Sequence, residues 1–243
     1  MKAYTKHKGE IKMKKATKFL LGIVLGILLL TPVSQVKADW HRDNVGWWYK
    51  PEYGSYYKDI ETQIDGKWYK FDERGYMMTG WHLREYRFAG GGFEKNWSYF
   101  DPVSGEKKFG WQKIDGKWYY FDPVNSDMKT GWISKQGVND IVWCYFAPES
   151  GEQLLGWQTI DGKTYYFNEF GEAFAGQVTF QDGKTYYFDP ANCDLKTGWL
   201  ELNGRKYYAD PNDGGAFASN KTLVIDGVSY TFGIDGSIIN NEP

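Results

Sequence analysis

The residues of this sequence that could do chemistry are its aromatic rings, which are concentrated in short charged segments. The segment Gly110–Asp122, GWQKIDGKWYYFD, contains two tryptophans, two tyrosines and one phenylalanine among thirteen residues, and four others are charged. Aromatic rings bury large apolar areas, stack on flat apolar faces and attract cations through their π-systems. We therefore expect the rings of this segment to divide between packing and a second task.

The aromatic segments belong to a repeat that runs along the chain. Gly-Trp begins a unit at five positions, Gly176-Gln177 is a degenerate sixth, and these six starts are 20 to 30 residues apart. Ile60–Thr79 is the same unit without its Gly-Trp, Asp39–Tyr57 is an atypical first unit, and a unit with fewer aromatics begins at Asn220. A repeat of this length with atypical ends predicts a solenoid, whose terminal units face water. The Gly-Trp starts are Gly80, Gly110, Gly131, Gly156 and Gly198.

Each unit carries the signal of a β-hairpin. Asp-Gly at 65–66, 115–116, 161–162, 182–183 and 226–227, and Asn-Gly at 203–204, fit two-residue type I′ turns. Residues with high β propensity flank each turn. Because a single hairpin of this size is marginal alone, the hairpins must stack. We predict an all-β fold, a repeat β-solenoid of stacked β-hairpins.

Strand alternation sorts the rings of one unit. Trp118 and Tyr120 point to one face of their strand, while Tyr119 and Phe121 point to the other. We expect Tyr119 and Phe121 to form the solenoid core and the tryptophans to line an outer groove between successive hairpins, since small stacked hairpins offer no deep interior for two indoles.

The first 38 residues read as a secretory signal peptide. A basic stretch is followed by the apolar run Phe19–Leu30 and by a small-residue cleavage site that ends at Ala38, and Met13 is an alternative start. The run is too short to favour a permanent membrane span. We divide the rest into atypical N-terminal repeats (39–79), consensus-like repeats (80–175), and degenerate C-terminal repeats with a cap (176–243).

Charge and side-chain chemistry exclude several classes of function. Residues 39–243 hold 21 Lys and Arg against 30 Asp and Glu, a formal net charge of −9, which argues against nucleic acid and anionic membrane surfaces as partners. His41 and His82 are isolated, so we expect no catalytic triad and no metal site, and hence no enzyme. Cys144 and Cys193 are expected to be unpaired thiols, with a bridge as the alternative.

The segment GWQKIDGKWYYFD, with MKTGW following at Met128, resembles the choline-binding repeats of Gram-positive cell-wall proteins over residues 40–240. The units at 156–197, with KTYYF in place of KWYYF, are similar to related glucan-binding repeats. The resemblance implies a left-handed superhelix of the choline-binding-module type, with ligand sites between consecutive hairpins. It implies choline or phosphocholine as the ligand, no cofactor, and a secreted protein attached non-covalently to the cell wall or surface.

The resemblance also implies which residues form the sites. In the family, a cage takes two indoles from one unit, the second Tyr of WYY from the next unit, and a Met or Leu near the loop. Carried over by position, this gives three cages in the middle of the array. They are Trp111, Trp118, Tyr145 and Met128; Trp132, Trp143, Tyr166 and Leu154; and Trp81, Trp97 and Tyr120, with Lys107 at the Met position.

Other positions match the family pattern less well. From Gly176 onward, the cage positions are lost, which predicts a structural cap or a partner surface. The incomplete sets are Trp40 with Trp48, faced by Lys70; Trp68 with Tyr99, where Glu61 replaces the first Trp; and Trp157 with Tyr187, where Thr164 replaces the second Trp.

These expectations together predict a non-catalytic wall-binding protein. Its partners would be choline-decorated teichoic and lipoteichoic acids, and its role that of an adhesin or a modulator of wall hydrolases. A glucan- or carbohydrate-binding module is the alternative, since sugars also stack on aromatic faces. Host proteins, wall hydrolases and a choline-dependent dimer are left open as further partners.

Overall fold

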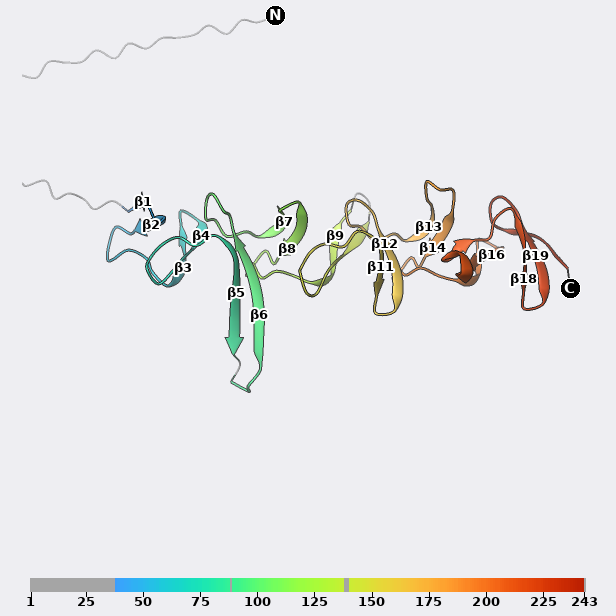
Figure 1. Ribbon diagram of the computed structural model, residues 1–243, viewed down its shortest axis with the longest axis horizontal. Coiled ribbons are helices and arrows are strands. Elements are labelled where there is room, and N and C mark those ends of the chain that lie inside the picture. The colour runs from blue at the N-terminus through green and yellow to red at the C-terminus, as the bar shows by residue number, and fades with distance from the viewer. Residues whose placement is uncertain (1–37, 88, 138–139, 243) are drawn as a thin grey trace, which may run out of the picture.

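The computed structural model describes residues 38–87, 89–137 and 140–242, and within them the chain forms nine antiparallel β-hairpins arranged along a rod (Figure 1). The expected signal peptide lies outside the described residues, apart from Ala38. The nine pairs are β1 (Asp39–Arg42) with β2 (Trp47–Lys50), β3 (Ile60–Ile64) with β4 (Lys67–Phe71), β5 (Gly80–Arg87) with β6 (Phe93–Phe100), β7 (Gly110–Ile114) with β8 (Lys117–Phe121), β9 (Gly131–Gln136) with β10 (Ile141–Phe146), β11 (Gly156–Ile160) with β12 (Lys163–Phe167), β13 (Gly176–Thr179) with β14 (Thr185–Phe188), β15 (Gly198–Leu202) with β16 (Arg205–Asp210), and β18 (Lys221–Ile225) with β19 (Val228–Phe232).

Short additional elements complete the C-terminal end. β17 (Ala216–Phe217) adds a third strand beside β16, and β20 (Ile238–Glu242) adds one beside β19. A single 3₁₀ turn, η1 (Pro211–Asp213), lies between β16 and β17. The expectation of an all-β array of consecutive hairpins is therefore confirmed, while the left-handed superhelix and the three-part division of the array remain predictions.

The hairpin turns follow the sequence signal at five of six positions. At Asp115 and Gly116, φ is 50° and 83°, so both central residues lie in the left-handed region that a type I′ turn requires. The prediction at 182–183 is wrong, because Gly183 has positive φ but Asp182 does not. There the Phe180 N–H donates to the Lys184 carbonyl across a longer loop, since this unit has one more residue before its turn.

The core is a column of rings that point inward from the second strand of each hairpin. Along β8, Tyr119 and Phe121 are 8% and 0% exposed, whereas Trp118 is 40% exposed, so the predicted alternation of faces is confirmed. The same phenylalanine position is buried in seven hairpins. They contribute Phe71, Phe100, Phe121, Phe146, Phe167, Phe188 and Phe232.

A backbone hydrogen bond joins each of the first six hairpins to the loop that follows the next hairpin. We number these junctions as steps, step 1 being the junction of the first and second hairpins. At step 3, the N–H of Met128, in the loop after β8, donates to the carbonyl of Trp97 in β6 (2.7 Å). The same bond places Met77, Lys107, Gln153, Ala173 and Leu195 at steps 1, 2, 4, 5 and 6.

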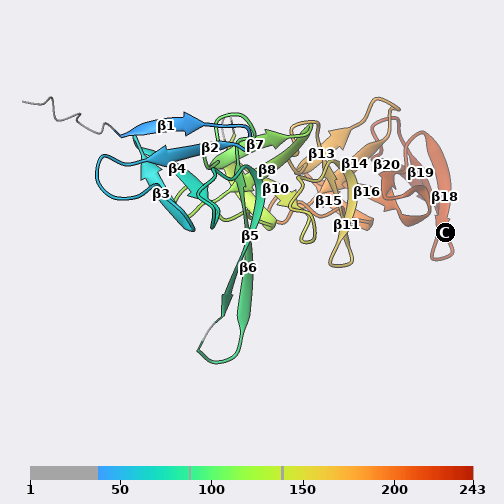
Figure 2. The same ribbon diagram turned by 60° about the vertical axis from the view of Figure 1, so that its left-hand side comes forward.

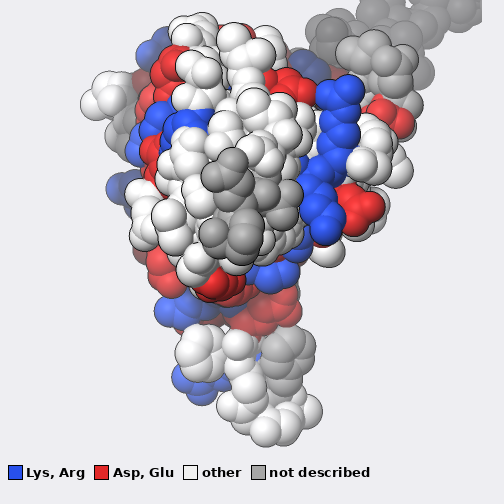
Figure 3. Space-filling view, turned by 90° about the vertical axis from the view of Figure 1, so that its right-hand side faces the viewer, with Lys and Arg blue, Asp and Glu red and all other residues white. Residues whose placement is uncertain are grey.

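Polar side chains also link every pair of consecutive hairpins. In each pair, a side chain that follows one hairpin contacts a side chain of the preceding hairpin. At steps 1 to 6, the first of these residues immediately precedes the loop position just described. Figure 3 shows positive and negative residues interspersed on the solenoid viewed end-on. At step 1 the Tyr76 hydroxyl donates to Asp43. Steps 2 to 8 hold Lys67–Glu106, Arg84–Asp127, Lys117–Glu152, Lys135–Glu172, Lys163–Asp194, Lys184–Asp213 and Arg205–Asp235.

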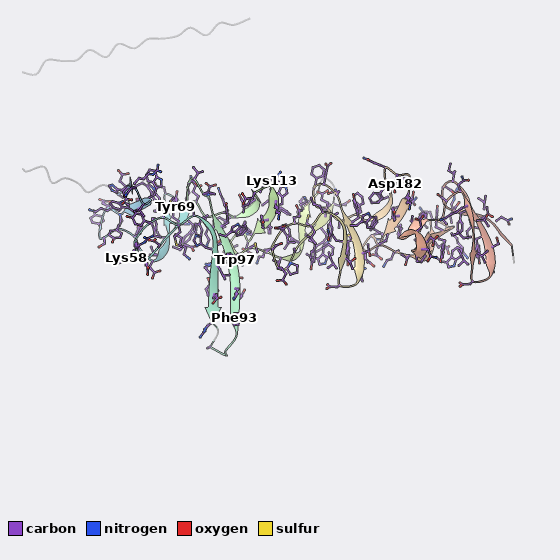
Figure 4. All side chains as sticks on the ribbon, in the orientation of Figure 1. Lys58, Tyr69, Phe93, Trp97, Lys113 and Asp182 are labelled. Atoms are coloured by element: carbon purple, nitrogen blue, oxygen red, sulfur yellow. The ribbon has the colours of Figure 1, made fainter. Side chains whose placement is uncertain are left out.

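One hairpin is much longer than the others. β5 and β6 each span eight residues and project from the side of the rod (Figures 1 and 2). Trp97 lies at the base of this hairpin and Phe93 near its tip, as Figure 4 shows. The base therefore keeps the spacing of an ordinary unit, and the added residues lie beyond it.

Candidate functional site: aromatic cages between hairpins

The most complete aromatic site lies at step 3. Trp81 and Trp97 come from the third hairpin, and their rings meet edge to face with centroids 6.3 Å apart. Tyr119, from the fourth hairpin, lies 4.9 Å from Trp81, and Met128 follows that hairpin. These four residues, with Glu149 and Ser150 of the next loop, line a groove of about 330 Å³. Three consecutive hairpin units therefore build one site.

The cage tyrosine at step 3 is not the one that we expected from the family pattern. Tyr119 replaces Tyr120, whose ring lies instead 5.1 Å from Trp111 of its own hairpin. The reason is the stacking direction. The inward-facing ring of one hairpin lies against the first indole of the preceding hairpin, so a core residue also forms one wall of the cage. The loop position is also different, because Met128 belongs to this step and Lys107 to the one before.

A second complete site lies at step 1, where we expected only an incomplete one. Trp40 and Trp47 of the first hairpin meet Tyr69 and Met77 of the second, with Trp40 and Tyr69 centroids 4.8 Å apart. Val103, Ser104 and Glu106 of the third unit complete a groove of about 330 Å³.

Two sequence assignments at step 1 are corrected. Trp47, not Trp48, is the second indole of this cage. Trp47 lies opposite Arg42 in the first hairpin, and Trp118 lies opposite the equivalent residue, Lys113, in the fourth. Trp48 stacks on His41 with centroids 4.2 Å apart. Lys70 lies opposite Glu61 in the strand register. Tyr69 therefore takes the cage position from which we had expected Lys70 to repel a cation. The spacing from the first Trp would have identified Trp47, because Trp40 and Trp47 are seven residues apart, as are Trp111 and Trp118.

Step 5 repeats the aromatic arrangement with a smaller loop residue. Trp132 lies 4.9 Å from Tyr165, and the N–H of Ala173 donates to the carbonyl of Trp143. Trp143 is 40% exposed. Tyr165 replaces the expected Tyr166, which lies 5.1 Å from Trp157, and Ala173 replaces the expected Leu154. Leu154 packs against the same buried cluster as Trp132.

Step 4 differs from the other Trp-Trp steps, although the sequence predicts a complete cage there. Trp111 and Trp118 line a groove with Lys135, Gln153, Glu169 and Phe170. The expected Tyr145 lies instead 5.1 Å from Trp132 of its own hairpin, and the buried Cys144 occupies the position of Tyr119. The Lys135 ammonium lies 5.2 Å from the centroid of the Trp111 ring.

Step 2 contains an ion pair where other steps contain an indole. Glu61 stands at the first Trp position, and its carboxylate pairs with the Lys107 ammonium, whose side chain is 3% exposed. Burial holds the pKa of Lys107 below its usual value, and the ion pair with Glu61 opposes this shift. Tyr99, expected beside Trp68, lies 4.9 Å from Trp81, and the buried Ser98 takes the tyrosine position.

Two of the C-terminal steps, 6 and 8, keep a single indole each. At step 6, Phe180 stacks on Trp157 with centroids 5.6 Å apart and an interplanar angle of 21°, and Tyr186, rather than the expected Tyr187, lies 5.1 Å from the indole. At step 8, Trp199 lies 4.8 Å from Tyr230. A groove beside this pair is lined by Trp199, Leu200, Glu201, Lys206, Tyr230 and Ile238.

The cages at steps 1 and 3 suit a cation with an apolar surface. Each offers π-faces and one thioether, and each has a carboxylate at its rim, Glu106 at step 1 and Glu149 at step 3. A cation over a well-placed ring gains roughly 0.5 to 2 kcal/mol. Within the described ranges, no group of His, Cys, Asp and Glu is placed to hold a metal ion, and no helix is long and apolar enough to cross a membrane.

Comparison with protein families places the sequence among known repeats. Residues 108–155 and 154–195 match the model of the choline-binding repeat, and residues 197–214 match a putative cell wall binding repeat. The chain is a choline-binding repeat protein. No protein in a search of curated sequences matches it significantly.

Solved structures of similar proteins share the hairpin array. This choline-binding repeat protein is 30% identical to choline-binding protein F from Streptococcus pneumoniae, with a TM-score of 0.62 over 80% of this chain and 61% of that one. A structure of CbpF in complex with ipratropium matches at 29% identity and a TM-score of 0.63, over 80% of this chain and 63% of that one. CbpJ from S. pneumoniae TIGR4, at 22% identity and a TM-score of 0.51 over 84% and 94% of the two chains, shares the fold. The chain thus spans less than two thirds of the length of these two CbpF chains.

Proposed function

We propose that the protein binds choline groups of teichoic and lipoteichoic acids through the cages at steps 1, 3 and 5, and so attaches non-covalently to a Gram-positive cell wall. The observation that carries this proposal is the step 3 cage, in which two indoles, Tyr119 and Met128 surround a groove with a carboxylate at its rim. A quaternary ammonium donates no conventional hydrogen bond, so cation–π attraction and apolar contact with its methyl groups must hold it.

Several weak cages on one rod suit a polymer that displays many choline groups. Once one cage is occupied, a second cage meets its ligand at the effective concentration that the shared polymer sets, and avidity can exceed each single affinity by about 10² to 10⁴. The described residues consist of repeat units, and we propose a binding role rather than a catalytic one, as an adhesin or as a competitor that restrains wall hydrolases.

Intrinsic tryptophan fluorescence tests the proposal directly, because each proposed cage contains two indoles. Titration with choline chloride should change the emission of the full chain at millimolar concentrations, while equal concentrations of sodium chloride should not. A chain that shows no response below about 50 mM choline, and that does respond to dextran or maltose, would exclude choline as the ligand.

One site favours a second candidate, carbohydrate binding in the C-terminal part. At step 8, the exposed Trp199 indole lies beside Glu201 and Lys206, which face each other across β15 and β16. A flat apolar ring next to hydrogen-bonding side chains matches the alternating apolar and hydroxyl faces of a sugar. Titration with maltose and dextran would test this, with Trp199→Ala expected to remove a response that Trp97→Ala leaves intact.

A further inference from the structure

At step 4, the chain places its own ammonium against an aromatic pair. The Lys135 Nζ lies 5.2 Å from the centroid of Trp111, and its side chain is 25% exposed. The same nitrogen forms an ion pair with Glu172 at 3.1 Å. Lys135 also lines the groove that contains Trp111 and Trp118. A cation over the face of an indole is the arrangement that a choline cage would offer to its ligand.

Two linked departures from the repeat make room for this lysine. Lys135 lies three residues after the first Trp of its hairpin, a position at which Ile114 and Ile160 are buried in their own hairpins. Cys144 occupies the tyrosine position of the same hairpin and is fully buried. The small thiol replaces a ring that forms a cage wall at steps 1, 3 and 5, and the longer cationic side chain replaces a residue of the core.

Step 2 shows a related pair of departures, with a buried lysine at the loop position rather than at the position of Ile114. Its tyrosine position holds the buried Ser98, and its loop position holds Lys107, whose ammonium pairs with Glu61 and lies 5.7 Å from the centroid of Phe100. The steps that lack the cage tyrosine thus both contain a lysine of the chain, whereas steps 1 and 3 have none among their lining residues.

We propose that Lys135 is an internal occupant of the Trp111–Trp118 site and closes that site to quaternary ammonium ions. Choline there would meet a fixed like charge. Glu172 already pairs with Lys135, and the groove itself is lined by one further carboxylate, Glu169. A tethered cation is also present at a far higher effective concentration than a weak free ligand. Lys107 closes step 2 in the same way, so choline binds at alternate steps, 1, 3 and 5. This selectivity rests on the proposed choline-binding function.

The indole N–H signals of the full chain test the proposal at single sites. In a nitrogen-15 spectrum, the signals of Trp97 and Trp118 are assigned from Trp97→Phe and Trp118→Phe. Choline chloride is expected to shift the Trp97 signal and to leave the Trp118 signal in place. The Trp97 signal reports on the proposed function, whereas the Trp118 signal reports on closure of step 4. A Trp118 shift with the same half-saturation as Trp97 would overturn the closure.

The double variant Lys135→Ile/Cys144→Tyr restores the repeat residues at step 4 and should open the site. We expect choline to shift the Trp118 signal in this variant, with half-saturation within about 30-fold of that at Trp97 in the wild type, the largest difference that one ring supplies. Cys144→Tyr alone, which keeps Lys135, is the matched control, and choline should not shift its Trp118 signal. If choline does not shift the Trp118 signal of the folded double variant either, Lys135 is not what closes the site, whether or not the Trp97 signal shifts.

Discussion

The ring of Tyr119 lies 4.9 Å from the indole of Trp81, although the two residues belong to different hairpins and Tyr119 is only 8% exposed. Their planes meet at 65°, an edge-to-face contact that stabilises the stacked hairpins. The same tyrosine forms one wall of the groove that contains Trp97 and Met128. Core packing and ligand binding therefore depend on one side chain at this step.

Tyr119→Leu should weaken choline binding at step 3, because it removes one π-face from the cage and leaves an apolar side chain in the core. The expected loss is about 2- to 30-fold, the value of one ring. The choline dependence of the Trp97 indole signal measures it. Tyr120→Leu is the matched control, since the Tyr120 ring lies against Trp111 of its own hairpin. An equal loss in the two variants would contradict the assignment of the cage tyrosine.

Trp47→Ala should remove the step 1 site, whereas Trp48→Ala should keep it. Trp47 lines the groove with Trp40 and Tyr69, while Trp48 stacks on His41 outside it. Calorimetric titration with choline should give one site fewer for Trp47→Ala and an unchanged number for Trp48→Ala. The reverse pattern would restore the pairing of Trp40 with Trp48 that we expected from the sequence.

The sequence predicted the hairpins and their inward-facing rings because both depend on local signals. The Asp-Gly turn and the alternation along Lys117–Phe121 are properties of one unit. Which residues form a site depends on how one unit stacks on the next, and the sequence of a single unit does not reveal this stacking. The inward-facing Tyr119 thus joins a site of the preceding hairpin, and the loop residue Met128 contributes to the same step.

The limits of the sequence are clearest at step 4. The consensus residues Trp111 and Trp118 predict a complete cage at this step, and the two positions that change it lie in the next hairpin, at Lys135 and Cys144. Conversely, the sequence predicts an incomplete cage at step 1, because Lys70 would face Trp40 and Trp48. Trp47 and Trp48 are adjacent, and only the strand register shows which of them belongs to the cage. A Lys at the position of Ile114 is the signal that could have identified the closed step.

Phe121→Ala should destabilise the array strongly, because the Phe121 ring is fully buried in the column of phenylalanines. The expected loss is about 3 to 5 kcal/mol of unfolding free energy, the usual cost of the cavity that a buried phenylalanine leaves. Urea unfolding measures the loss. Val124→Ala is the control, since Val124 is 88% exposed and should change the free energy by less than about 0.5 kcal/mol. Similar losses in both variants would contradict the role of the column.

Acid should destabilise the loops that connect the hairpins. The pKa of Asp101 lies well below its ordinary value because Lys108 pairs with the carboxylate and the N–H groups of Ser104 and Val103 donate to it. A carboxylate whose pKa is lower in the folded state adds stability above its unfolded pKa and loses this contribution as the pH falls through the folded value.

We therefore expect the melting temperature to fall as the pH drops below about 4, and Asp101→Asn to reduce that fall. Asn168 occupies the same loop position in another unit and accepts N–H groups from Phe170 and Glu172, so asparagine is compatible with the turn. Thermal unfolding between pH 3 and 7 compares the two chains. A variant with the full acid dependence of the wild type would exclude Asp101 as a contributor.

The two cysteines should be free and unreactive in the folded protein. Cys144 is 0% exposed in β10 and Cys193 is 6% exposed in a loop, and burial raises the pKa of both thiols. Because the thiolate is the reactive form, a raised pKa and a buried sulfur both slow attack on a disulfide reagent. Ellman's reagent at pH 8 should thus detect few thiols in the native chain and two per chain in denaturant without reductant. If denaturant alone exposed no thiol, the two cysteines would be bridged.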